Sequence, residues 1–156
     1  MTPRNWLYPL SAKSTRYFVD KDRRRTPDTC FGCFVHLFLS DRTDDHWYLT
    51  HHFNHVSEGD RIWPYYGTAD GDQGVVGLAR IIKKNAPFRD GTHGIKIQWD
   101  RDATHRLIRA AVPAEIVRHY VKWPRAAVID LDRHSALVGL LEQASGMTVK
   151  QQAGHK

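Results

Sequence analysis

The stretch EGDRIWPYYGTADGDQGVVGLARIIKK, residues 58–84, decides the fold. Gly59-Asp60 is a turn signal, RIWPYY (61–66) predicts a strand, and VVGLARII (75–82) predicts a second strand after a glycine-rich loop. Pro64 cannot donate a hydrogen bond to a neighbouring strand, so it favours a sheet edge or a bulge at that point. The stretch therefore predicts a hairpin-like segment that is unusually dense in aromatic side chains.

The segments on either side extend the β pattern. NWLYPL (5–10) predicts a first strand. GIKIQWD (94–100) alternates, which places Ile95, Ile97 and Trp99 on one face of a strand. RLIRAAV (106–112) is interpreted as one more strand.

Helices are expected late in the chain. AEIVRHYV (114–121) follows Pro113 and predicts a helix whose apolar stripe is formed by Ile116, Val117, Tyr120 and Val121. Asp132 can cap a further helix that Gly146 closes. We expect an α+β fold, a curved β-sheet or barrel with a few surrounding helices, in one domain over residues 1–146, with a flexible tail at 147–156.

Composition narrows the function. The 156 residues contain no apolar run of about 18, so no membrane span is expected, and the N-terminus has no secretory pattern, so the cytoplasm is expected. The formal net charge is +6, from 23 Lys and Arg against 17 Asp and Glu. This favours a polyanionic partner, because each cation set against a phosphate releases counterions. The alternative is a solvated basic surface without such a partner.

The aromatic residues of the 61–66 strand permit two interpretations. Trp63 and Tyr65 share a face with Arg61, because residues two apart in a strand point the same way. A Trp and a Tyr beside a cation suit stacking on a nucleobase, at about 1–3 kcal/mol per base. The alternative is that Trp63 packs in the core, as most tryptophans do.

Motifs for catalysis and metal binding are weak. GTADGDQG lacks the lysine of a phosphate-binding loop, and neither G-x-S-x-G nor H-E-x-x-H occurs. Cys30 and Cys33 form a single C-x-x-C near several histidines, but without a second such pair two buried thiols are favoured over a zinc site. We therefore expect no enzyme, no cofactor and no metal.

The order of four segments resembles a known family. NWLYPL, SEGDRIWPYYG, GVVGLARI and GIKIQWD together are similar to the EVE domain, a PUA-like relative of the YTH readers of methylated adenine. The resemblance covers about residues 4 to 140, although HWYLTHHFNHV stands where EVE domains have a W-D-G-V-R-N segment. It implies a small β-barrel with helices and an aromatic pocket for a flipped or single-stranded modified base, modified cytosine in DNA above all.

These considerations give a set of expected site residues. The aromatic slot is expected from Trp47, Trp63, Tyr65 and Trp99, and polar contacts to the base edge from Ser11, Ser14 and Asp100. Phosphate contacts are expected from Arg23, Arg24, Lys83, Lys84 and Arg101. The expected function is a non-enzymatic module that binds nucleic acid, DNA before RNA, at a modified base. The alternatives are a protein-interaction module paired with an effector protein of a defence or modification system, and a small metal-dependent hydrolase or nuclease.

Overall fold

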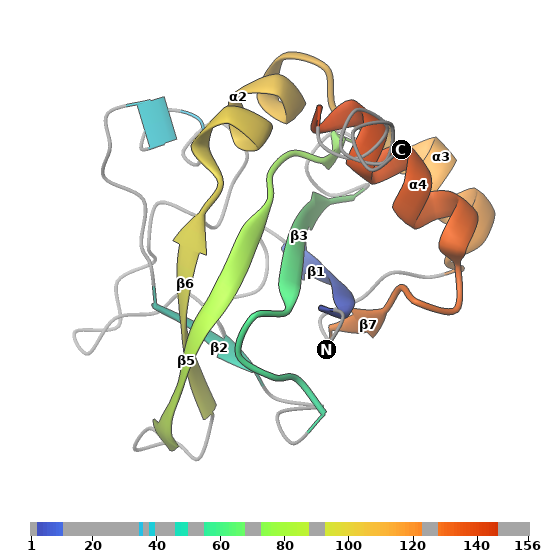
Figure 1. The fold of residues 1–156 in the computed structure, drawn as a ribbon. Helices are drawn as coiled ribbons and strands as arrows, with labels where there is room; N and C mark the ends of the chain where they lie inside the picture. The colour runs from blue at the N-terminus through green and yellow to red at the C-terminus, as the bar shows by residue number, and fades with distance from the viewer. Residues whose placement is uncertain are drawn as a thin grey trace, which may run out of the picture.

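The computed structural model describes residues 3–10, 35, 38–39, 46–49, 55–67, 73–87, 93–122 and 128–146. Within these ranges the strands form one sheet in the order β2-β6-β5-β3-β1-β7, with the short β4 also paired to β3 (Figure 1). The strands are β1 (Asn5–Leu10), β2 (His46–Leu49), β3 (Arg61–Tyr66), β4 (Gly74–Val75), β5 (Ala79–Pro87), β6 (His93–Trp99) and β7 (Ile129–Asp130). The helices are α2 (Arg101–Arg109), α3 (Ala114–Tyr120) and α4 (Ser135–Ala144). The expected α+β class is confirmed.

The centre of the sheet joins two segments that lie far apart in the sequence. β1 runs parallel to β3 over its whole length, from Asn5 opposite Arg61 to Leu10 opposite Tyr66. Both strands begin and end where the sequence predicts. The predicted strand at 75–82 is divided, because β4 ends at Val75 and β5 begins at Ala79.

Pro64 does not lie at an edge, so that alternative is wrong. The bulge alternative agrees with the pairing, because Ile62 pairs with Ala79 and Tyr65 with Val75, which leaves one more residue on the β4–β5 side than on β3. β3 has β1 on one side, and on its other side it pairs with β5 at Arg61 and Ile62 and with β4 at Tyr65 and Tyr66. Pro64 lies between these two pairings, where only its carbonyl is used, accepting from Val76 N at 3.1 Å. The interior strand tolerates the proline because its missing donor falls at the change of partner.

Apolar side chains cover both faces of β3. Ile62 and Tyr66 belong to an inner core on one side of the sheet, together with Trp6, Tyr8, Val56, Val76, Ala79, Ile81, Ile95, Ile97 and Val128. Trp63 and Tyr65 belong to a second core between the sheet and the three helices, which includes Leu7, Leu107, Val117, Leu137 and Leu141. A strand buried on both faces reads as a continuous apolar run, which explains the density of RIWPYY.

Asp60 fixes the entry into β3. Its carboxylate is 3% exposed and accepts three hydrogen bonds, from Arg4 N at 3.1 Å, Ser57 N at 2.9 Å and Trp6 Nε1 at 3.0 Å. Gly59 precedes it with a φ of 94°, a conformation that suits glycine. The Gly-Asp pair therefore ties the start of β1 to the start of β3.

Two of the three described helices, α3 and α4, are predicted from the sequence. α3 and α4 lie where helices are predicted, although Ile116 is 40% exposed rather than part of the buried stripe. The strand predicted at 106–112 is wrong, because residues 101–109 form α2. Asp100 is its N-cap and accepts from Ala103 N at 3.0 Å, while Arg106 and Arg109 occupy its last turn. Among the described helices, none has the length and apolar character needed to cross a membrane.

Asp132 serves the sheet rather than α4. Its carboxylate accepts from Asn5 N and from Asn5 Nδ2, both at 3.1 Å, whereas the N-cap position of α4 is His134. The predicted cap is therefore wrong, because β7 and the turn after it bring Asp132 against the start of β1. Gly146, with a φ of 82°, follows the end of α4 as predicted.

Candidate functional site

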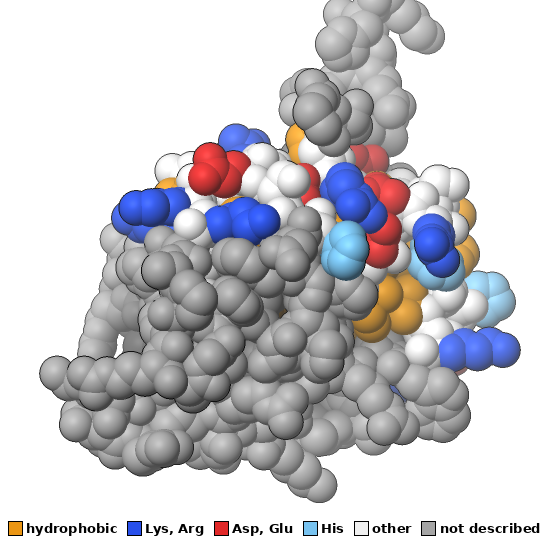
Figure 2. Space-filling view, turned by 90° about the horizontal axis from the view of Figure 1, so that it is seen from below, with side chains coloured by type: hydrophobic (Ala, Val, Ile, Leu, Met, Phe, Trp, Pro, Cys, Tyr) orange, Lys and Arg blue, Asp and Glu red, His pale blue; other side chains and the backbone are white. Residues whose placement is uncertain are grey.

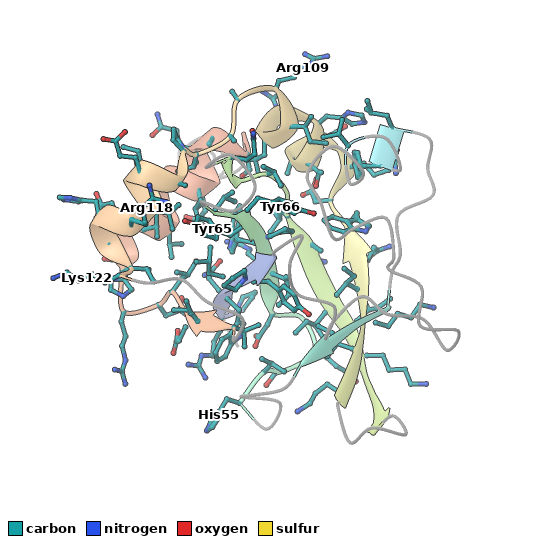
Figure 3. The ribbon with its side chains drawn as sticks, turned by 180° about the vertical axis from the view of Figure 1, so that it is seen from behind. His55, Tyr65, Tyr66, Arg109, Arg118 and Lys122 are labelled. Atoms are coloured by element: carbon teal, nitrogen blue, oxygen red, sulfur yellow. The ribbon has the colours of Figure 1, made fainter. Side chains whose placement is uncertain are left out.

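Two residues expected in a base-binding slot lie in the core instead. Trp63 is 0% exposed, and its Nε1 donates to Asn5 Oδ1 at 3.0 Å. Tyr65 is 2% exposed, and Arg118 of α3 points toward it, with Nη1 3.5 Å from the hydroxyl (Figure 3). The helices cover the face that these side chains share with Arg61. The core interpretation of Trp63 is therefore correct, and the expectation that Trp63 and Tyr65 stack on a base is wrong.

Several expected residues cannot be placed with their side chains. Ser11, Ser14, Arg23 and Arg24 lie outside the described residues, as do Cys30, Cys33 and most of the histidines near them. Trp47 lies in β2 and pairs in register with Ile95 of β6. Among the residues that the structure describes, no group of three or more His, Cys, Asp and Glu side chains is placed to hold a metal ion.

Trp99 lies at the end of β6, partly buried, in a cluster of rings and cations. The Phe38 ring approaches it edge-on, with centroids 6.0 Å apart, and the His105 ring meets Phe38 edge-on, with centroids 5.0 Å apart. Arg101 places its guanidinium 4.6 Å from the Phe38 centroid and donates to the Phe38 carbonyl at 3.4 Å. Arg101, expected on a phosphate, is thus held by a cation–π contact, although it stays exposed.

The two adjacent lysines of β5 diverge. Lys83 is exposed and pairs in register with Lys96, whereas Lys84 pairs with Ile95 and donates from Nζ to the Val56 carbonyl at 2.9 Å. Neighbouring residues of a strand point to opposite faces, so the two cannot bind one phosphate group from the same side. Lys84 secures the segment before β3, and its expected phosphate role is corrected accordingly.

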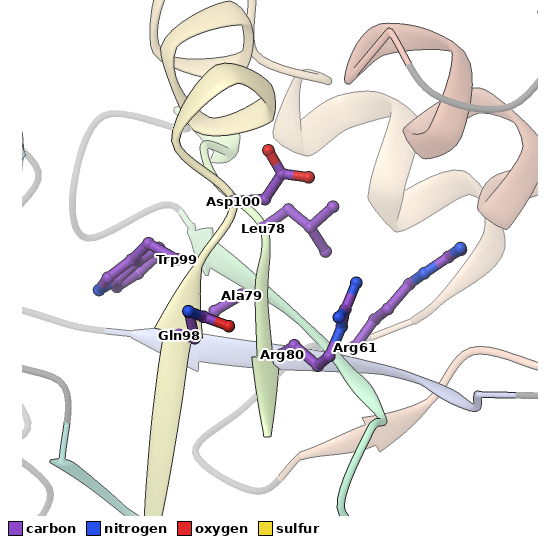
Figure 4. Close-up of a pocket in the computed structure, with 7 residues that line it drawn as sticks. All are labelled: Arg61, Leu78, Ala79, Arg80, Gln98, Trp99 and Asp100. Carbon is purple, nitrogen blue, oxygen red and sulfur yellow. The ribbon is translucent and has the colours of Figure 1, made fainter. Parts of the chain in front are cut away.

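A pocket of about 140 Å³ lies between the starts of β3 and β5 and the end of β6 (Figure 4). Its polar lining comes from Arg61, Arg80, Gln98 and Asp100, and Leu78 adds an apolar wall. The volume is below the roughly 300–1,000 Å³ of clefts that bury a drug-sized ligand. The pocket can therefore take one polar group of a larger ligand rather than the whole of it.

The charges in this pocket are not equivalent. Arg61 forms an ion pair with Glu142 of α4, with Nη1 2.5 Å from Oε2, and one Asp100 oxygen is occupied by the cap of α2. Arg80 is exposed and pairs in register with Arg61 on one side and Gln98 on the other. Arg80 and Gln98 are thus the lining side chains with donors that no carboxylate of the described residues engages. Neither residue is predicted from the sequence as part of a site, although the alternation of residues 94–100 places Gln98 on the polar face.

Trp99 belongs to the lining of the pocket, but its ring is turned away from the polar side chains there. The Trp99 ring points away from the side chains of Arg80 and Gln98 (Figure 4), and it rests against Gly77, where an added Cβ would come within 3.2 Å of Cζ3. The described pairing of β2 with β6 stops at His46 opposite Lys96. Beyond that point, in the described ranges, β6 carries the Trp99 ring on one face and the side chain of Gln98 on the other.

Comparison with known proteins identifies no family for this chain. No family model matches the chain, and no curated protein matches it. A similar solved structure is the NMR structure of Rpa0253 from Rhodopseudomonas palustris, a structural genomics consortium target, which is 16% identical. The match covers 88% of this chain and 92% of that chain, with a TM-score of 0.46.

Proposed function

We propose that the protein is a non-enzymatic nucleic-acid-binding module of PUA-like fold, a member of the EVE family, that recognises a modified nucleobase in the cytoplasm. Modified cytosine in DNA is the first candidate ligand. The four segments that resemble EVE domains are β1, β3, the β4–β5 region and β6, and these strands are neighbours in the sheet. The resemblance therefore concerns a connected part of the fold rather than scattered motifs.

The observation that carries the proposal is the partly buried Trp99 at the end of β6, beyond the described pairing with β2. Trp63 and Tyr65 are used in the core, so an aromatic slot would have to be built from Trp99 and Trp47. Trp47 pairs with Ile95, and Ile95 lies four residues before Trp99 on the same face of β6. The register therefore sets Trp47 of β2 beside the β6 residue that shares a face with Trp99.

The energetics of base recognition suit such a site. A base that leaves a duplex loses a few kcal/mol of stacking and pairing, and an aromatic surface returns about 1–3 kcal/mol per base. Discrimination of a methyl group needs only a close apolar wall, worth roughly 1–3 kcal/mol. Arg101, held on Phe38 beside Trp99, adds a cation at the same place.

The test is binding to short oligonucleotides that differ in one base. Cytosine, 5-methylcytosine, 5-hydroxymethylcytosine, adenine and N6-methyladenine are compared in DNA and RNA at fixed salt. We expect one modified base to be preferred, and Trp99→Ala to reduce its affinity by about 5- to 150-fold, the equivalent of one stacked base. Trp47→Ala is expected to act in the same direction.

Tyr120→Ala is the matched control, because Tyr120 is a partly buried aromatic residue of α3 that packs on the second core, between the sheet and the helices. It should leave the preference unchanged, with melting temperatures measured for every variant. Equal affinity for all oligonucleotides would refute base recognition. Absence of nucleic-acid binding, with one stoichiometric protein retrieved from cells, would favour the interaction module instead.

A further inference from the structure

Three cations lie together on the outer face of β5 and β6, the face opposite the inner core. Arg80 pairs with Gln98, and Lys83 pairs with Lys96. Lys96 and Gln98 alternate with the buried Ile95 and Ile97, so they point away from the core. We call Arg80, Lys83 and Lys96 the cationic track.

A bulge creates this arrangement. The register shifts between Ile81 and Lys83, so that Ile82 is inserted without a partner and is 39% exposed. Strict alternation from Ile81, which is buried, would turn Lys83 toward the inner core. The extra residue returns Lys83 to the outer face, opposite Lys96, and bulges commonly re-aim side chains in this way beside functional sites.

The track is unfavourable for the free protein. Like charges directly opposite each other on neighbouring strands are destabilising. Arg61, which faces Arg80, is compensated by Glu142, but among the described residues no carboxylate forms an ion pair with Arg80, Lys83 or Lys96. An arrangement that costs stability, without a compensating carboxylate in the described part of the chain, indicates an anionic ligand.

The track also lies on an accessible part of the sheet. The three helices gather at one end of the molecule, and the lower parts of β5 and β6 extend away from them (Figure 1). Seen from below, several Lys and Arg side chains lie on the described surface, among Asp, Glu and His side chains (Figure 2). Arg80 and Lys83 are exposed, and Lys96 is partly exposed.

We propose that the cationic track binds the sugar–phosphate backbone of the same nucleic acid strand whose base is read beside Trp99. This inference rests on the proposed function. Arg80 and Gln98, which belong to the pocket at the end of β6, would hold one phosphate group there, because guanidinium and amide donors both serve as phosphate contacts. Lys83 and Lys96 would hold the next part of the backbone, further along the same two strands.

The salt dependence of binding tests the track. Each phosphate contact contributes about −0.7 to the slope of log K against log salt for a single strand and about −0.9 for a duplex. The double variant Lys83→Gln with Lys96→Gln should therefore have a slope less negative by about 1.4 with single-stranded DNA and about 1.8 with duplex DNA. Between about 50 and 200 mM salt, the unaltered protein should lose about sevenfold more single-strand affinity than the variant.

The control is Lys122→Gln with Arg133→Gln, two exposed cations outside the track that give the same change in net charge. Lys122 lies beyond α3, far from β5 and β6 (Figure 3). The control pair should leave the slope nearly unchanged. An equal effect of both pairs, or no effect of the track pair, would overturn the track.

The two proposals fail in different ways. Loss of salt dependence in the track variant, without preference for any modified base, would retain the track and refute base recognition. If the track variant keeps both the preference for a modified base and the salt slope of the unaltered protein, base recognition is retained and the track is refuted. No binding of single-stranded or duplex DNA or RNA, even at low salt, would overturn both.

Discussion

Replacing Asp60 with asparagine should lower the free energy of unfolding more than the same replacement at Asp132. The Asp60 carboxylate is buried and accepts from three N–H groups, two on Oδ2 and one on Oδ1. An asparagine keeps one acceptor oxygen. Whichever way its amide is turned, its NH₂ group faces at least one of these donors.

The magnitude follows from the donors that lose their partner. A hydrogen bond to a charged group contributes about 1.5–3 kcal/mol, and a buried donor left unsatisfied costs about 1–3 kcal/mol. The best orientation of the substituted amide retains the bonds to Trp6 Nε1 and Ser57 N and loses the one to Arg4 N. We therefore expect Asp60→Asn to lower the free energy of unfolding by about 2–4 kcal/mol.

Urea denaturation, followed by tryptophan fluorescence, measures this loss. With an m-value of about 2 kcal/mol/M, the midpoint should fall by about 1–2 M urea while m stays constant. Asp132→Asn is the matched control, because Asp132 also accepts two bonds from Asn5 but its side chain is 40% exposed. Water can replace those bonds, so the control should lose less than about 1 kcal/mol.

A loss below about 1 kcal/mol for Asp60→Asn, or a loss equal to that of Asp132→Asn, would refute this reasoning. Either result would mean that the Gly-Asp turn does not hold β1 and β3 together through its carboxylate.

Three further predictions concern stability. Trp63→Ala should lower the free energy of unfolding by about 3–5 kcal/mol in the same urea titration, because it empties a core position; a smaller loss with altered nucleic-acid affinity would return Trp63 to the binding site. Gly74→Ala should lower the free energy of unfolding by at least about 3 kcal/mol, because its Cβ would lie 1.9 Å from the Val112 carbonyl oxygen. At Gly59 an added Cβ would have no atom within 4 Å, so Gly59→Ala should lose only about 1–2 kcal/mol, for the left-handed backbone conformation. Lys96→Gln should raise the melting temperature slightly at low salt and have no effect in 1 M salt, where repulsion from Lys83 is screened; a lower melting temperature would show that Lys96 has a stabilising partner.

Local patterns are sufficient for much of the secondary structure. β1, β3 and β6 have the composition or alternation of strands, and α3 and α4 carry helix start and stop signals. α2 is missed because RLIRAAV is apolar enough for a strand, while the signal for a helix stands before it, in Asp100 as N-cap and Asp102 in the first turn. Asp100 is expected from the sequence at a base edge, and the structure uses one of its oxygens as the cap instead.

The remaining errors depend on tertiary structure. Whether Trp63 faces a ligand or a core is decided by helices that follow it by roughly 40 residues or more in the sequence. Whether Lys83 faces outward is decided by one inserted residue in the pairing of β5 with β6. No periodicity within RIWPYY or ARIIKK contains that information, because each strand alone is consistent with either arrangement.

The position of β1 has a consequence for synthesis of the chain. β1 is made before its partners, which are β3, beginning at Arg61, and β7, beginning at Ile129. At about 5–20 residues per second, a ribosome needs roughly 6–25 s to add the residues that separate Trp6 from Asp130, its partner in β7. Throughout that time the apolar segment NWLYPL has at least one unpaired edge, which is a template for wrong strand pairing. Chaperone binding to the nascent NWLYPL segment, and aggregation of chains that end before residue 128, are the expected signs of this delay.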